Sequence, residues 1–126
     1  MVDDHPMVRQ GLRAIVEQFD RIQVVGEAGN GQEAVQLAQT LRPDVAIMDV
    51  NMPVMDGIEA TRRITTRYPH VVVIGLSVHN SPQVAEAMKQ AGAAAFLTKD
   101  AAPEQLNQAI YGALHERRTR SDPDRS

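Results

Sequence analysis

Short apolar runs alternate along the chain with longer segments in which apolar residues recur every three or four positions. The runs lack polar alternation, which is typical of strands that are covered on both faces in a parallel sheet. They span residues 22–28 (IQVVGEA), 44–50 (DVAIMDV), 71–77 (VVVIGLS) and 94–98 (AAFLT). The pattern therefore predicts repeated strand–helix units around a parallel sheet.

The segments between the runs have the spacing of amphipathic helices. Their apolar faces are Val8, Leu12, Ile15, Val16 and Phe19; Val84, Ala87, Met88 and Ala91; and Leu106, Ala109, Ile110, Ala113 and Leu114. Segments 30–41 and 57–67 are less regular but contain good helix formers. Pro6, Pro82 and Pro103 stand where the first turn of a helix would lie. Together these features favour an open, doubly wound α/β sheet.

The two ends of the pattern are irregular. A first strand should precede Asp3, but Met1 and Val2 alone stand before it, whereas a strand usually has about five or six residues. We expect this central strand to be truncated and the structure to be less stable there. Beyond about residue 115 the chain becomes rich in Arg, Ser, Asp and Pro. We predict one domain over 1–114 and a disordered tail, or the start of a linker, over 115–126.

Composition is that of an ordinary water-soluble domain. The 126 residues are 43% hydrophobic and 23% charged, and their net charge of -3 gives no basic footprint for nucleic acid. Without cysteine, the chain can form no disulfide, thiolate metal site or thiol nucleophile. No apolar run reaches the roughly 20 residues of a membrane helix, and the N-terminus does not resemble a signal peptide. A cytoplasmic location is the default expectation.

Polar residues follow the predicted strands at their carboxyl ends, where ligands bind in doubly wound sheets. They are Asp3 and Asp4, then Asp49 with Asn51 and Asp56, then Ser77 with His79, and finally Lys99 with Asp100. Two carboxylates 4 Å apart repel by about 4 kcal/mol at an effective dielectric near 20, so acids from adjacent strands need a cation. Oxygen donors suit Mg²⁺ or Mn²⁺ better than Zn²⁺, and His5, the nearby nitrogen donor, is not assigned as a ligand. Alternatively, Asp4 caps the helix near Pro6 and Asp3 is merely solvated.

Lys99 and Ser77 would flank Asp49 at this edge. A lysine charge and a hydroxyl donor beside a metal-bound carboxylate can neutralise phosphoryl oxygens, so that Asp49 attacks phosphorus and becomes an acyl phosphate. As structural alternatives, Lys99 is a surface lysine and the Ser77 hydroxyl bonds to backbone. The convergence of all these groups on one edge favours the chemical role.

Four motifs, VDDHPMVRQGL, PDVAIMDVNMPVMDGIEA, VIGLSVHN and FLTKDAAPEQL, occur in this order. Their identity and spacing resemble the receiver domain of bacterial two-component response regulators, over residues 1–114. DDHPMVRQGL and VVGEAGNGQEAV are most similar to the LuxR/FixJ-type subfamily, which carries a helix-turn-helix output domain. The resemblance implies a flavodoxin-like, five-stranded parallel sheet of order 2-1-3-4-5 with five helices, here with a truncated first strand.

The resemblance also implies a signalling switch and not an enzyme with an external substrate. Asp49 would accept a phosphoryl group from a sensor histidine kinase, and its own chemistry would be limited to self-directed phosphotransfer and autodephosphorylation. Mg²⁺, or alternatively Mn²⁺, would be bound by Asp4, by Asp3 through water, by Asp49 and by the backbone carbonyl of Asn51.

The remaining family positions carry the readout. Lys99 and Ser77 would bind phosphoryl oxygens, while Ser77 and Phe96 would form a switch acting on the face of the fourth helix, fifth strand and fifth helix. Asn51 and His79 would tune dephosphorylation, although Phe96 as a core aromatic and His79 as a plain loop residue stay open. We expect a homodimer on phosphorylation, no membrane partner, and DNA contact through an output domain absent from this chain.

Three rival hypotheses fit less well. A haloacid-dehalogenase-type hydrolase also uses a strand-end Asp but needs an acid two residues later, where this chain has Asn51. A flavin or nucleotide module needs a phosphate loop after the first strand, and DDHP would repel phosphate. A degenerate receiver that makes only protein contacts is disfavoured because every expected site residue is present. A stand-alone regulator and an excised domain both stay open.

Overall fold

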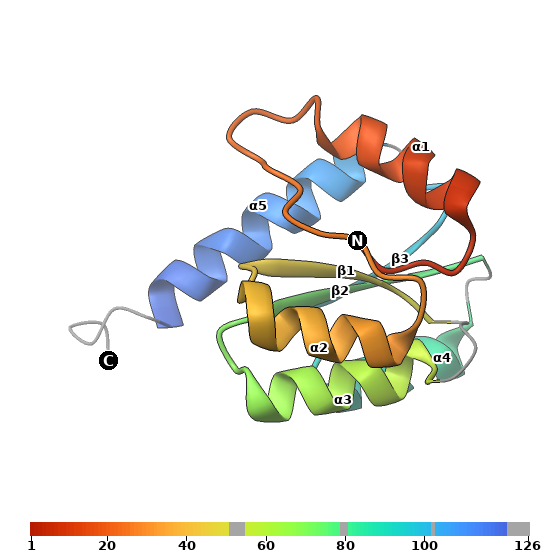
Figure 1. The fold of residues 1–126 in the computed structure, drawn as a ribbon, viewed down its shortest axis with the longest axis vertical. Coiled ribbons are helices and arrows are strands. Elements are labelled where there is room, and N and C mark those ends of the chain that lie inside the picture. The colour runs from red at the N-terminus through yellow and green to blue at the C-terminus, as the bar shows by residue number, and fades with distance from the viewer. Residues whose placement is uncertain (51–54, 79–80, 102, 121–126) are drawn as a thin grey trace.

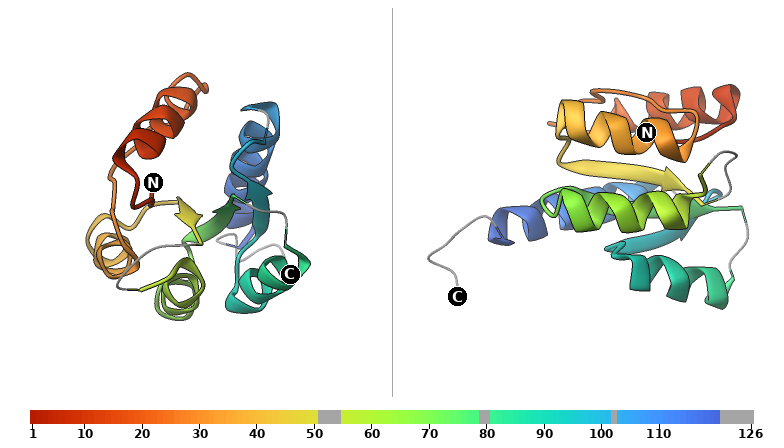
Figure 2. Two further views of the ribbon diagram at one scale, coloured as in Figure 1. Left: turned by 90° about the vertical axis from the view of Figure 1, so that its right-hand side faces the viewer. Right: turned by 60° about the horizontal axis from the view of Figure 1, so that its bottom comes forward.

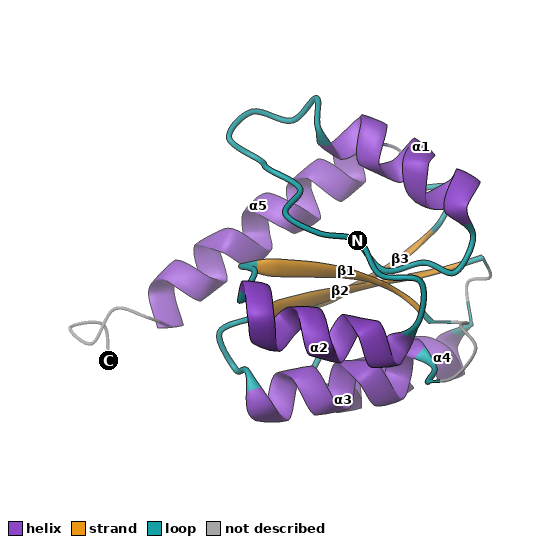
Figure 3. Ribbon diagram, in the orientation of Figure 1, coloured by secondary structure: helices purple, strands orange, loops and turns teal. Residues whose placement is uncertain are grey.

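Helices enclose a small parallel sheet in the computed structural model, which describes residues 1–50, 55–78, 81–101 and 103–120 (Figure 1). The elements are α1 (Pro6–Val16), α2 (Gly31–Leu41), β1 (Val45–Asp49), α3 (Gly57–Arg67), β2 (Val72–Ser77), α4 (Pro82–Ala91), β3 (Ala95–Thr98) and α5 (Pro103–Arg120). From β1 onward, strands and helices alternate as the apolar runs predicted (Figure 3).

The sheet has the order β1-β2-β3, with all neighbours parallel. Beyond β1, Val2 forms isolated parallel bridges to both Met48 and Ala28. Ala28, Val2 and the three strands therefore follow one another in the predicted order 2-1-3-4-5. The predicted strand over 22–28 is instead a loop that meets the sheet at Ala28, since two residues before Asp3 offer too little backbone to pair with it.

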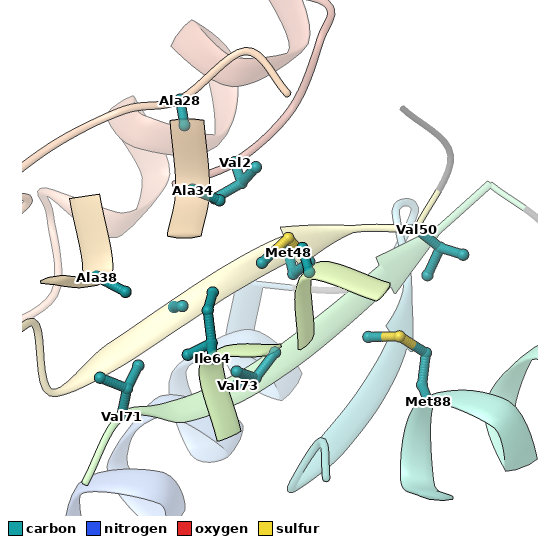
Figure 4. Packing of buried hydrophobic residues seen from close by; sticks show 12 residues of the cluster. Val2, Ala28, Ala34, Ala38, Met48, Val50, Ile64, Val71, Val73 and Met88 are labelled. Atoms are coloured by element: carbon teal, nitrogen blue, oxygen red, sulfur yellow. The ribbon is translucent and has the colours of Figure 1, made fainter. Parts of the chain in front are cut away.

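The strands are covered on both faces, as their continuous apolar runs predicted. Helices α2, α3 and α4 lie on one face, while α1 and α5 lie on the other (Figure 2). Met48 and Val73 pack with Ile64 of α3 on the first face (Figure 4). Ile47 and Ile74, one residue along their strands, pack against α5 on the opposite face. This period of two follows from the pleat of the strands.

Side-chain caps fix where the central helices begin. Asn30 accepts the Glu33 N–H at 2.9 Å, Asp56 accepts the Glu59 N–H at 2.9 Å, and Ser81 accepts the Val84 N–H at 3.3 Å. Each side chain satisfies a backbone donor that the first turn leaves without a helical partner. Pro6, Pro82 and Pro103 begin α1, α4 and α5, as predicted.

Helix α5 continues to Arg120, beyond the end near residue 115 that the sequence predicted. Residues 121–126 lie outside the described part, so the boundary between 1–114 and 115–126 stays a prediction. No helix within the described ranges is both long and apolar enough to cross a membrane.

A cavity of about 250 Å³ lies beside Met1, at the edge of β1. Apolar side chains from the 22–26 loop, α2, β1 and α5 line it, including Val24, Leu37, Ile47 and Ile110. It lies between the loop and β1, next to the isolated bridges of Val2. The loop and β1 are therefore not packed tightly against each other there.

Candidate functional site

The strand ends deliver polar side chains to one edge of the sheet. Asp49 ends β1, Ser77 ends β2 and Lys99 directly follows β3, while Asp3 follows the bridging residue Val2. The Asp49 N–H donates to the Val2 carbonyl at 2.9 Å, and the Lys99 N–H donates to the Ser77 carbonyl at 2.7 Å. Backbone pairing thus brings residues 96 positions apart in the chain to the same place.

Lys99 lies between two buried carboxylates. Its Nζ is 2.8 Å from Asp3 Oδ2 and 3.2 Å from Asp49 Oδ2, and both aspartates are only 2% exposed. Burial acts to raise the pKa of Asp3, but bonds from Lys99 and from the His5 N–H outweigh it and leave that pKa lowered. Burial likewise acts to lower the pKa of Lys99, and the two carboxylates raise it instead. Both groups of this pair therefore remain ionised at neutral pH.

Three aspartates converge on a space that one lysine does not neutralise. Ligand atoms of Asp3, Asp4, His5 and Asp49 all lie within 4.8 Å of one another. Asp4 Oδ1 is buried and has no hydrogen-bond partner within the described residues. A buried carboxylate oxygen without a partner is energetically unfavourable, and a bound cation would satisfy it. The donor set therefore fits a divalent ion that accepts oxygen ligands, such as Mg²⁺.

Backbone hydrogen bonds and the side chain of Arg9 hold Asp3 in place. Its N–H donates to the Ala28 carbonyl at 3.0 Å, and its Oδ1 accepts the His5 N–H at 2.9 Å. Arg9 Nη1 donates to the Asp3 carbonyl at 2.6 Å, while Arg9 Nε donates to Glu27 at 3.0 Å. The role of Arg9, one turn into the helix that follows the acid pair, was not predicted from the sequence.

Gly57 allows α3 to begin close against Asp49. A Cβ at Gly57 would lie 2.1 Å from the Asp49 carbonyl oxygen, which is far inside contact distance. The Gly57 N–H also donates to the Val50 carbonyl at 2.8 Å. The position of Gly57 at the helix start was predicted from the sequence, but its close approach to the candidate phosphoacceptor was not.

The structure brings Asp3, Asp4, Asp49 and Lys99 together, with Ser77 buried at the neighbouring strand end. Phe96 pairs in register with Gly75, and a Cβ on that glycine would lie 3.1 Å from the Phe96 ring. The role of Phe96 as a switch stays a prediction. Asn51 and His79 lie outside the described residues, so the metal-binding carbonyl and the dephosphorylation roles also stay predictions.

Comparisons with known proteins show the family of this chain. The family model described as "Response regulator receiver domain" matches residues 1–111. The response regulator UvrY of Escherichia coli (strain K12) is 44% identical over 110 residues, covering 87% of this chain and 50% of that protein. The response regulator GacA of Pseudomonas viridiflava is 40% identical over 110 residues, covering 87% of this chain and 51% of that protein. The chain spans about half the length of these curated relatives.

Solved structures of response regulators share the fold of this chain. A two-component response regulator of the LuxR family from Aurantimonas sp. SI85-9A1 is 36% identical, with a TM-score of 0.87, and covers 91% of this chain and 82% of that chain. The signal receiver domain of NarL from Mycobacterium tuberculosis is 32% identical, with a TM-score of 0.86, and covers 90% of this chain and 92% of that chain. The flavodoxin-like fold and the resemblance to LuxR-type regulators are thereby confirmed. The chain belongs to the response regulator receiver domain family.

Proposed function

We propose that this chain is the phosphorylation-controlled switch of a cytoplasmic two-component system, with Asp49 as its phosphoacceptor. The observation that carries the proposal is the position of the Asp49 carboxylate. It is buried at the end of β1, 3.2 Å from Lys99 Nζ, and it shares the acidic cluster with Asp3 and Asp4. The chain acts as a regulator, and its chemistry is limited to its own phosphorylation and dephosphorylation.

The phosphoryl group comes from the phosphohistidine of a sensor histidine kinase. An oxygen of the Asp49 carboxylate attacks phosphorus, and the P–O bond forms while the P–N bond of the donor breaks. Lys99 neutralises one phosphoryl oxygen, and the Ser77 hydroxyl donates a hydrogen bond to another. The ionised state of Lys99 at neutral pH supports this role, because its two carboxylate partners raise its pKa.

Mg²⁺ is the cofactor that the residues fit best, with Mn²⁺ as the alternative. Asp4 and Asp49 would hold it directly, Asp3 through water, and Asn51 through its backbone carbonyl. When bound, the ion supplies charge neutralisation for the phosphoryl oxygens. The buried Asp4 Oδ1 supports the assignment, since it accepts no hydrogen bond within the described residues and its neighbour at 3.0 Å, His5 Nδ1, carries a charge only when protonated.

The signal passes from the site to the face formed by α4, β3 and α5. Ser77 moves toward the phosphoryl group and Phe96 changes rotamer with it, while Asn51 and His79 set the lifetime of the phosphorylated state. Phosphorylation promotes a homodimer, and DNA is contacted through a separate output domain. The roughly twofold greater length of the UvrY and GacA relatives supports an output domain, as does the similarity to LuxR-family regulators.

Labelling with acetyl phosphate in the presence of Mg²⁺ tests the proposal. Intact-mass analysis should show one added phosphoryl group, which Asp49→Asn and chelation of Mg²⁺ should both abolish. Asp56→Asn is the matched control: Asp56 is an exposed cap of α3, and Asn caps equally well, so labelling should persist. Lys99→Ala should slow labelling on the order of a hundredfold. Full labelling of Asp49→Asn would refute the assignment.

A further inference from the structure

Glu27 lies in the loop before α2 and is bonded to two arginines of α1. Arg9 Nε donates to Glu27 Oε1 at 3.0 Å, and Arg13 Nη1 donates to Glu27 Oε2. The bond from Arg13 holds the pKa of Glu27 below its usual value, against the effect of burial, and the bond from Arg9 adds to it. Each carboxylate oxygen therefore accepts from a different guanidinium, and the carboxylate is ionised at neutral pH.

Arg9 connects this carboxylate to the main chain of Asp3. Its Nη1 donates to the Asp3 carbonyl at 2.6 Å while its Nε is bonded to Glu27. The Arg9 side chain is only 21% exposed. Because a guanidinium is planar and rigid, an acceptor that fixes Nε also fixes the direction in which Nη1 points. The Glu27 carboxylate therefore determines how Arg9 meets Asp3.

Residues 27 and 28 together hold both polar groups of the Asp3 main chain. The Asp3 N–H donates to the Ala28 carbonyl at 3.0 Å, and the Asp3 carbonyl is linked to Glu27 through Arg9. In a regular parallel sheet a ladder of bonds fixes the backbone, whereas the neighbouring Val2 makes isolated bridges. The Arg9–Glu27 pair thus supplies a constraint on Asp3 that a strand ladder supplies in the centre of the sheet.

The direction of the Asp3 main chain sets where its carboxylate lies. Asp3 Oδ2 accepts from Lys99 Nζ at 2.8 Å, and the same Nζ lies 3.2 Å from Asp49 Oδ2. The Asp3 side chain is short, so a rotation of its backbone displaces Oδ2 from Lys99. A displacement of about 1 Å in a reacting site can cost on the order of a hundredfold in rate. The link from Glu27 through Arg9 to Asp3 therefore reaches the groups around Asp49.

A second carboxylate that bonds two arginines provides a comparison. Glu59 accepts from Arg62 at 2.6 Å and from Arg63 at 3.0 Å. All three residues lie in α3, and their side chains are 39–58% exposed. Exposed pairs of this kind contribute little to stability. Glu27 differs from Glu59 because one of its arginines also bonds a residue of the candidate site.

We propose that Glu27 is a positioning residue for the phosphorylation reaction: through Arg9, it holds the main chain of Asp3 so that the Asp3 carboxylate stays against Lys99. This inference rests on the proposed role of Asp49 as phosphoacceptor. Glu27 takes no part in the transfer itself, and its effect on the rate passes through Arg9.

The rate of acetyl phosphate labelling at saturating Mg²⁺ tests this role. Glu27→Gln keeps the size of the side chain but removes its charge, and labelling should slow by about tenfold. Glu59→Gln is the matched control, since it makes the same change in a carboxylate that also bonds two arginines, and its rate should stay within about twofold of wild type. Both variants are compared at a temperature where circular dichroism shows them fully folded, so that a loss of stability does not enter the rate.

A double variant shows whether Glu27 acts through Arg9. Arg9→Met should slow labelling at least as much as Glu27→Gln, and combining the two should slow it no further than Arg9→Met alone. Effects that multiply in the double variant would overturn the inference, as would labelling of Glu27→Gln at the wild-type rate.

Amide hydrogen exchange gives a readout that does not depend on phosphorylation. The Asp3 N–H should exchange about tenfold faster in Glu27→Gln than in wild type, while the Ile74 N–H in the centre of the sheet should exchange at its wild-type rate. Equal acceleration of both amides would mean a general loss of stability and would contradict a positioning role. Failure of the wild type to label would refute the role of Asp49, whereas unchanged exchange of the Asp3 N–H in Glu27→Gln would refute the link from Glu27 to Asp3.

Discussion

The centre of the sheet and the region beyond β1 are built differently. In the centre, β2 pairs along its length with β1 and β3, and its residues are buried throughout. Beyond β1, Val2 makes isolated bridges, and the 22–27 segment has no ladder. Asp3 nevertheless reaches the same cluster as Asp49, because Arg9, His5 and Lys99 hold it through polar contacts. A site residue can thus be positioned without a complete strand beneath it.

The difference also appears in the exposed fractions of similar apolar residues. Ile74 in β2 is 0% exposed, whereas Val25 in the loop is 53% exposed. Both belong to continuous apolar runs that predicted a doubly covered strand. The cavity of about 250 Å³ is lined by the 22–26 loop, which contains Val25, and not by Ile74. Packing energy is therefore expected to be concentrated in the β1–β3 half of the molecule.

Truncation of one apolar side chain in β2 and of one in the 22–28 segment tests this expectation most strongly. Ile74→Ala should lower the free energy of unfolding by about 3–4 kcal/mol, because it removes a fully buried side chain and leaves a void. Val24→Ala should lower it by less than about 1 kcal/mol, since Val24 is only partly buried and already borders the cavity. Urea denaturation of both variants measures the difference. Equal losses would mean that the loop is packed as tightly as the central strand.

The sequence predicted the well-packed half more accurately than the other. For β1 to β3, apolar runs and helix periodicity agree with the packing, so the elements and the cluster of Asp49 and Lys99 were both anticipated. For 22–28 the local pattern also favoured a strand, but pairing depends on a partner that the chain supplies only as Met1 and Val2. A pattern confined to the segment carries no information on that partner.

Two features of the site were beyond sequence reasoning for a similar reason. The bond from Arg9 to the Asp3 carbonyl depends on how α1 lies against the loop after Ala28, and the Gly57 contact depends on how closely α3 approaches β1. Both are distances between elements, which residue patterns do not encode. The acid pair, by contrast, was found because strand ends converge in any parallel sheet.

An apolar extension of the N-terminus should stabilise the region between the 22–26 loop and β1. An extension of four residues, Ile-Val-Val-Ile, placed before Met1 would run between the 22–26 loop and β1, where the cavity lies. We expect a gain of about 2 kcal/mol, because each fully buried Ile or Val contributes about 1.5–3 kcal/mol and backbone ordering offsets part of it. The extension also moves the amino group away from Met1, where burial lowers its pKa.

An extension of Gly-Ser-Gly-Ser is the matched control for length and for the displaced amino group. It adds no apolar side chain, so the gain should be absent or small. Denaturation midpoints measure both chains, and amide exchange over residues 22–28 should slow with the apolar extension alone. Equal stabilisation by the two extensions would show that the cavity is not the source of the weakness.

Substitution of Arg9 tests how Asp3 is held in place beside the isolated bridge of Val2, and it has the smallest expected effect. Arg9→Met keeps the aliphatic packing but removes the bonds to the Asp3 carbonyl and to Glu27. We expect a loss of about 1 kcal/mol in the free energy of unfolding, near the low end for charge-assisted bonds because the groups are partly exposed. Arg62→Met is the control, since Arg62 pairs with Glu59 on the exposed surface of α3, and stability should stay unchanged within error.

If Asp3 depends on Arg9 for its position, the affinity of the cluster for Mg²⁺ should fall severalfold in Arg9→Met and remain intact in Arg62→Met. Unchanged affinity in both variants would mean that Lys99, His5 and Ala28 suffice to position the Asp3 carboxylate.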